Sequence, residues 1–102
     1  MTGPVNERKA SLNMASRPRL ARGVRMREDK VRGRTVLLAP ERTVALDETG
    51  IAILNQLDGK STLRQVIDTL AETYDAPADV IEKDVVAFLD DLGARRFLEF
   101  ES

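Results

Sequence analysis

The chain has 102 residues, a length that suits a single domain with one modest hydrophobic core. It contains neither His nor Cys. This absence removes the usual ligands for zinc, the commonest general base and the most reactive nucleophile. We therefore expect a chain that is not an enzyme, with no catalytic residue, no metal site and no cofactor.

Hydropathy and the N-terminal segment allow a prediction of the cellular location of the protein. No uncharged apolar run is long enough to form a transmembrane helix. The first residues, Met1-Thr2-Gly3-Pro4, are not followed by the apolar segment of a secretory signal. Because cysteine is also absent, we expect a cytoplasmic protein that does not associate with membranes.

Charge is divided unevenly along the chain, although the net charge is only −1. Residues 1–34 hold ten Lys or Arg against three acids, whereas residues 35–102 hold six against fourteen. This division predicts a basic strip beside an acidic body.

Residues 1–17 are predicted to form a disordered N-terminal tail, because they are polar and contain few adjacent apolar residues. The organised part is expected to begin at Pro18, so that residues 18–102 form one domain.

Three short strands are predicted in the first half of this domain. Residues 24–28 alternate between apolar-leaning and basic positions, residues 34–39 are rich in Val and Leu, and residues 42–46 alternate again. Turns at Gly33 and at Pro40 separate these runs. Two tight turns between three strands predict an antiparallel meander.

Three helices are predicted after Asp47, where the apolar period lengthens. Asp47 is expected to cap the first helix and Ser61 the second, which ends near Tyr74. The third covers residues 78–92, with Gly93 as its C-terminal cap. The apolar residues 97–100 are expected to close over the core or to add a strand.

The order of these elements predicts the fold class. Each helix is too short to bury its apolar stripe alone, so the helices are expected to pack together and against the sheet. We expect an α+β, winged-helix-like fold, in which a three-stranded antiparallel sheet is followed by a three-helix bundle.

Two motifs suggest a phosphate-binding loop and a metal site, but their residue spacing does not suit either site. Gly59-Lys60-Ser61-Thr62 is similar to the end of a phosphate-binding loop, but the required earlier glycine is replaced by Leu54. Asp90 and Asp91 are adjacent on a helix and therefore point about 100° apart, which suits a solvated face better than a metal site.

The basic segment between Arg17 and Arg34 leaves a second function open. In a winged-helix nucleic-acid-binding protein, such a segment would grip phosphates and the third helix would enter the major groove. That helix carries Lys83 against five acidic residues, Asp79, Glu82, Asp84, Asp90 and Asp91. Because these acids would be repelled by a duplex, nucleic-acid binding is kept only as the alternative.

Several runs in chain order together resemble PqqD, the peptide chaperone family of pyrroloquinoline quinone (PQQ) biosynthesis. The runs are Arg17–Arg25, Leu37–Arg42, Leu46-Asp47, Leu54, Asp58-Gly59 and Asp84-Val85. The resemblance covers residues 17–100. It implies a precursor-peptide recognition element that binds the ribosomal peptide PqqA, and we expect this element to be a monomer. The resemblance also implies that this adaptor presents PqqA to the radical-SAM enzyme PqqE, which crosslinks a Glu and a Tyr side chain.

The resemblance further implies where the peptide binds. In related recognition domains the peptide adds as a strand beside the third strand and against the third helix. Carried onto this sequence, the peptide-binding residues are Arg42, Thr43, Val44, Ala45 and Leu46 in the strand and Lys83, Val86, Ala87 and Asp90 in the helix. A strand at a sheet edge offers free backbone groups for such pairing. A proline at Val44 is expected to abolish binding if the N–H at that position faces the peptide.

Overall fold

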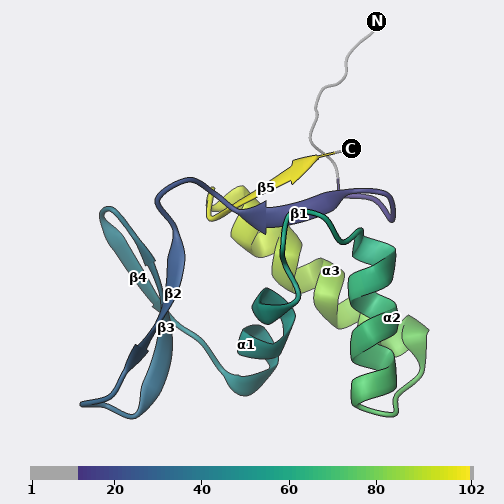
Figure 1. Cartoon of the computed structure of the whole chain (residues 1–102), viewed down its shortest axis with the longest axis horizontal. Coiled ribbons are helices and arrows are strands. Elements are labelled where there is room, and N and C mark those ends of the chain that lie inside the picture. The colour runs from purple at the N-terminus through teal and green to yellow at the C-terminus, as the bar shows by residue number, and fades with distance from the viewer. Residues whose placement is uncertain (1–11, 102) are drawn as a thin grey trace, which may run out of the picture.

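The computed structural model describes residues 12–101, in which two small antiparallel sheets accompany three helices (Figure 1). The elements are β1 (Arg17–Leu20), β2 (Arg25–Asp29), β3 (Arg34–Ala39), β4 (Arg42–Ala45), α1 (Glu48–Asn55), α2 (Leu63–Thr73), α3 (Ala78–Ala94) and β5 (Leu98–Glu101). One sheet has the order β2-β3-β4, and the other pairs β1 with β5. The predicted α+β class, a three-stranded antiparallel sheet followed by three helices, is confirmed.

The β2-β3-β4 sheet stands to one side of the helices in Figure 1. Its register places Leu37 of β3 between Met26 of β2 and Val44 of β4. Leu37 is fully buried, and Met26 and Val44 pack against the core. Because side chains alternate along a strand, these three residues lie on one face of the sheet, which we name the inner face.

Two helix caps show where the sequence interpretation holds and where it is wrong. Asp47 caps α1 as expected, and its Oδ1 accepts the N–H of Gly50 at 2.7 Å. The cap of α2 is Thr62, not Ser61. Thr62 and Gln65 form a reciprocal capping box, and the glutamine three residues after the cap decides between the two hydroxyl residues.

Gly93 does not cap α3, because the helix continues to Ala94 and Arg96 takes the positive φ of 68° after it. A Cβ at Gly93 would lie only 2.9 Å from the ring of Phe100 in β5. The glycine therefore allows β5 to approach the helix closely.

The β1–β5 pair was not foreseen, although an added strand at residues 97–100 was one of two expectations. Pro18 lies opposite Phe100 in this antiparallel pair. The Arg19 and Glu99 side chains form an ion pair of 3.1 Å across it. The pair joins the start of the described chain to its end.

Residues before Pro18 already contact the core and the start of α2. Ser16 is fully buried, and its carbonyl oxygen accepts the N–H of Leu63 at 2.8 Å. Met14 packs against the core and accepts the N–H of Arg64. Of the tail predicted over residues 1–17, residues 1–11 lie outside the described residues.

The core lies where the helices, the inner face and the β1–β5 pair meet. Its buried side chains are Leu37, Ile53, Leu54, Leu63, Val66, Ile67, Leu70, Val85, Leu89, Leu92, Phe97 and Leu98. Burial of each such side chain stabilises the fold by about 1.5–3 kcal/mol before the opposing loss of chain entropy. Within the described part of the chain, every helix is too short or too polar to cross a membrane.

Candidate functional site

β4 is an edge strand of the β2-β3-β4 sheet, so one side of its backbone has no strand partner among the described residues. Arg42, Thr43 and Ala45 are exposed, whereas Val44 and Leu46 are half-buried and pack against the core. The five strand residues predicted to bind peptide therefore form one continuous segment, held in place by its two apolar side chains.

The ladder between β3 and β4 determines which backbone groups of β4 remain free. The N–H of Leu46 donates to the carbonyl oxygen of Thr35 at 3.0 Å. Since bonding pairs alternate with non-bonding pairs in an antiparallel ladder, Val44 bonds to Leu37. Thr43 and Ala45 then direct their N–H and C=O groups toward the free edge. A proline at Val44 would consequently disrupt the sheet itself and would not test peptide binding.

The free edge of β4 differs from the other edges in charge. Its three residues after Arg42, Thr43-Val44-Ala45, carry no charge. The edges of β1, β2 and β5 all carry Arg, Glu or Asp at every second position or more often. Charged residues on an edge strand oppose pairing with another chain. Among the described strands, β4 is therefore the edge most open to an added strand.

The four helix residues predicted to bind peptide share one face of α3. Lys83, Ala87 and Asp90 are exposed and Val86 is half-buried. In the described chain α3 packs most closely with α2 and β5, whereas β4 packs with β3. The strand residues and the helix residues predicted to bind peptide thus each pack mainly against other elements of the fold.

Asp90 lines a hollow beside β5. Together with Gly93, Ala94, Leu98, Glu99 and Phe100, it lines an open space of about 530 Å³ between α3 and β5. The β1–β5 pair, which the sequence interpretation did not foresee, supplies the second wall of this hollow. Asp90 therefore faces the β5 side of the helix.

One contact joins the start of β4 to the segment that follows α3. The guanidinium of Arg42 lies over the ring of Phe97, 4.3 Å from its centroid. Phe97 is 1% exposed, and the arginine side chain covers one face of its ring. Arg42 thus has a structural contact in addition to its place at the edge.

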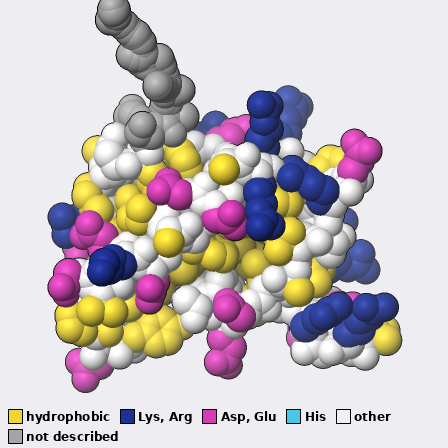
Figure 2. Space-filling view, turned by 180° about the vertical axis from the view of Figure 1, so that it is seen from behind, with side chains coloured by type: hydrophobic (Ala, Val, Ile, Leu, Met, Phe, Trp, Pro, Cys, Tyr) yellow, Lys and Arg dark blue, Asp and Glu magenta, His cyan; other side chains and the backbone are white. Residues whose placement is uncertain are grey.

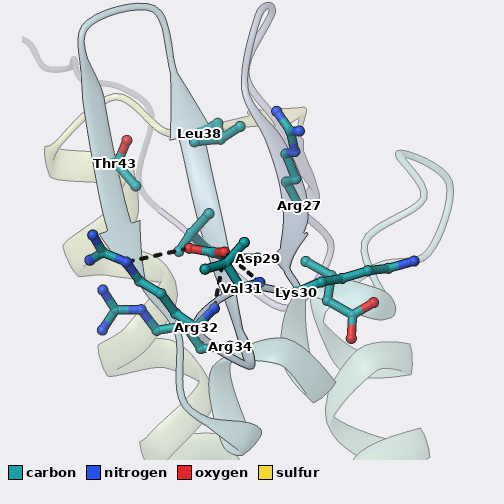
Figure 3. Close-up of a pocket in the computed structure, with 10 residues that line it drawn as sticks. Arg27, Asp29, Lys30, Val31, Arg32, Arg34, Leu38 and Thr43 are labelled. Atoms are coloured by element: carbon teal, nitrogen blue, oxygen red, sulfur yellow. Dashed lines mark hydrogen bonds and ion pairs between the residues drawn. The ribbon is translucent and has the colours of Figure 1, made fainter.

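The face of the sheet opposite the inner face, named here the outer face, carries an open hollow of about 710 Å³ (Figure 3). Leu38 and Thr43 lie opposite each other on this face, as do Val36 and Ala45. Basic residues of β2, β3 and their turn surround the apolar centre: Arg27, Lys30, Arg32 and Arg34. Because side chains alternate along a strand, the apolar run Val36-Leu37-Leu38 implies apolar residues on both faces of β3.

The charge division predicted from the sequence is visible on the surface. Figure 2 shows most Lys and Arg side chains on the side of the molecule that carries the β2-β3-β4 sheet, while acidic side chains are spread over the helical side. The described residues contain no cluster of acidic side chains that would hold a metal ion.

Asp58, in the loop between α1 and α2, has a lowered pKa. Its Oδ1 accepts the N–H of Ser61 at 2.7 Å and that of Lys60 at 2.9 Å. These bonds favour the carboxylate and hold the pKa below its ordinary value of 3.8. The Gly59-Lys60-Ser61-Thr62 segment therefore folds around a carboxylate of its own chain and serves as a turn.

We expect this loop to make stability depend on acid pH. Because the folded pKa is depressed, the contribution of Asp58 is present above 3.8 and is lost as pH falls through the lower folded value. Thermal midpoints of the wild type and of Asp58→Asn, measured between about pH 5 and about pH 2, should converge as the pH falls. A constant difference across this range would contradict the assignment.

Comparisons with known proteins give a consistent picture. The family model of coenzyme PQQ synthesis protein D (PqqD) matches residues 34–98. A PqqA binding protein from Rhizobium meliloti (strain 1021) is 51% identical over 81 residues, which cover 79% of this chain and 83% of that protein. The bifunctional coenzyme PQQ synthesis protein C/D of Methylorubrum extorquens AM1 is 49% identical over 82 residues, which cover 80% of this chain and 22% of that protein.

Two solved structures are also similar. The solution structure of the PqqD truncation of Methylobacterium extorquens PqqCD, a stand-alone recognition element for ribosomally synthesized and modified peptides, has a TM-score of 0.75 and 44% identity. The alignment covers 88% of this chain and 96% of that one. The crystal structure of PqqD from Xanthomonas campestris has a TM-score of 0.54 and 41% identity over 76% of this chain and 87% of that one.

Proposed function

The chain belongs to the PqqD family of coenzyme PQQ synthesis proteins, and from this membership we propose that it binds the precursor peptide PqqA as a strand added to β4. The observation that carries the proposal is the free, uncharged edge at Thr43-Val44-Ala45. An added strand gains backbone hydrogen bonds from Thr43 and Ala45, and its side chains then supply selectivity.

The role proposed for the chain is that of a non-catalytic adaptor. Binding PqqA and the radical-SAM enzyme PqqE together raises the effective concentration of the peptide at the enzyme, which then crosslinks the Glu and Tyr side chains. This role requires no nucleophile or general base from the adaptor. A disordered peptide must become ordered on binding, so we expect moderate affinity.

The face of α3 that carries Lys83, Val86, Ala87 and Asp90 is proposed as a second contact. Its exposed residues offer a surface to a peptide that continues past the Arg42 end of β4. The Arg42–Phe97 contact supports this route, because it brings that end of the strand close to the segment after α3.

A titration tests both contacts. We expect ¹⁵N-labelled full-length protein to show amide shifts at residues 42–46 when unlabelled PqqA peptide is added, with smaller shifts along α3. Shifts confined to β2 or to the β1–β5 pair would overturn the assignment to β4.

The nucleic-acid alternative predicts a different outcome. A short DNA duplex would then bind tightly with a steep salt dependence, while the peptide would cause no shifts. The acidic residues exposed on α3, Asp79, Asp84, Asp90 and Asp91, disfavour that result.

A further inference from the structure

The outer face of the β2-β3-β4 sheet carries an apolar strip that the core does not use. Val36 is buried, at 8% exposed, and Leu38 is half-buried, yet both lie outside the hydrophobic cluster that Leu37 forms with the helices. Thr43 and Ala45, their cross-strand neighbours on β4, are small and exposed. On the side of the free edge of β4, the strip is therefore bordered only by these two small exposed side chains.

A strand added to this edge would place every second side chain over the outer face. Neighbouring strands lie about 4.8 Å apart, so the added strand would run about 10 Å from β3. A long apolar side chain spans much of this distance by lying across Thr43 or Ala45, and the Leu38 or Val36 side chain meets it from the other side. A bulky residue at either β4 position would block this path.

Arg32 and Arg34 lie at one end of the same strip, where Asp29 forms an ion pair of 3.9 Å with Arg32. In Figure 3 the guanidinium groups of Arg32 and Arg34 reach toward the β4 side of the sheet, whereas Lys30 points the other way and Arg27 extends along β2. Arg34, Val36 and Leu38 alternate along β3, so the arginine lies one step beyond the apolar strip on the same face. A carboxylate on the added strand would complement this end.

We propose that the outer face is a side-chain subsite for the strand added to β4, and that it selects a large apolar residue and an acidic residue separated by two or four positions. The apolar side chain lies over Thr43 and Leu38 or over Ala45 and Val36, and the carboxylate lies beside Arg34. The even spacing follows because only alternate residues of a strand share a face. This inference rests on the proposed binding of peptide at β4.

The experiment measures binding of fluorescently labelled PqqA to the full chain and to three variants. Leu38→Asn replaces the apolar surface by a polar side chain of similar size, and Arg34→Glu reverses the charge beside β4. Arg27→Glu is the matched control, because it makes the same charge change on the strand farthest from the edge. Circular dichroism checks that each variant is folded, and the exposed Arg34 position provides a test should Leu38→Asn fail to fold.

The expected result is that Leu38→Asn and Arg34→Glu each weaken binding about tenfold, whereas Arg27→Glu changes it by less than about threefold. An alanine scan of PqqA should then find one sensitive apolar and one sensitive acidic position at an even spacing. Equal losses for Arg27→Glu and Arg34→Glu, or an odd spacing in the peptide, would overturn the subsite.

The subsite and the proposed function fail in different ways. If PqqA still shifts the amide signals of residues 42–46 in the wild type while all three variants bind PqqA normally, the proposed subsite is wrong, but binding at the β4 edge is retained. If the wild type shows no shifts at β4, both are wrong.

Discussion

Replacing Ala45 by proline is expected to weaken PqqA binding about tenfold or more, while the protein stays folded. Proline removes the N–H that Ala45 directs toward the free edge and places its ring where an added strand would approach. One lost hydrogen bond and this steric conflict together exceed about 1.4 kcal/mol, which is tenfold in affinity. The ladder to β3 is unaffected, because Ala45 does not donate to it.

Two further proline variants make this prediction specific. Glu28→Pro acts on β2, the other edge of the sheet, and should leave PqqA binding unchanged. Val44→Pro removes a bond to Leu37 and an apolar contact, so it should lower the free energy of unfolding by about 2–4 kcal/mol. Affinity from fluorescence anisotropy and stability from urea denaturation separate these effects. If Ala45→Pro binds PqqA as tightly as the wild type, the peptide does not pair with β4.

Whether Val44 or Ala45 directs its N–H toward the free edge of β4 is not determined by the sequence alone. Alternation of apolar residues predicted the strand and its buried face, because Val44 and Leu46 must both reach the core. Which backbone groups bond to β3 depends on the register between the strands, and register is a property of the pair. The Leu46–Thr35 hydrogen bond supplies that information in the structure.

The peptide-binding site predicted on α3 depends on tertiary structure for a related reason. Helical spacing predicts that Lys83, Ala87 and Asp90 share one face of α3, since that spacing is local, and all three are exposed. Which element lies beside that face is decided by contacts between distant residues, such as Pro18 with Phe100. Four-residue strands at the two ends of a domain have too weak a local pattern to predict their pairing.

The segment that follows α3 is held in place mainly by Phe97, through both its ring and its backbone. Phe97 is one of the largest fully buried side chains of the described residues. Its N–H donates to the carbonyl oxygen of Leu92 at 2.9 Å, and its own carbonyl oxygen accepts the N–H of Ala21 at 2.8 Å. The residue therefore ties the end of α3 to the chain that leaves β1, while its ring supports Arg42.

Phe97→Ala is accordingly expected to lower the free energy of unfolding by about 3–5 kcal/mol. Domains of this size are stable by roughly 5–15 kcal/mol, so this loss is a large share of the total free energy of unfolding. Urea denaturation measures the change, and Phe97→Leu, which retains much of the apolar volume, should cost less. A loss below about 1 kcal/mol for Phe97→Ala would contradict the packing described for this ring.

Combining Phe97→Leu with Arg42→Ala tests whether this ring also positions β4. If the guanidinium stabilises the fold through the ring, the two changes should be non-additive by about 0.5–1 kcal/mol, because each removes the same contact. In the folded Arg42→Ala variant, PqqA should still bind at Thr43 and Ala45, but its shifts along α3 should diminish, since the contact that brings β4 toward the end of that helix is gone. Unchanged shifts along α3 would mean that the helix face is reached without Arg42.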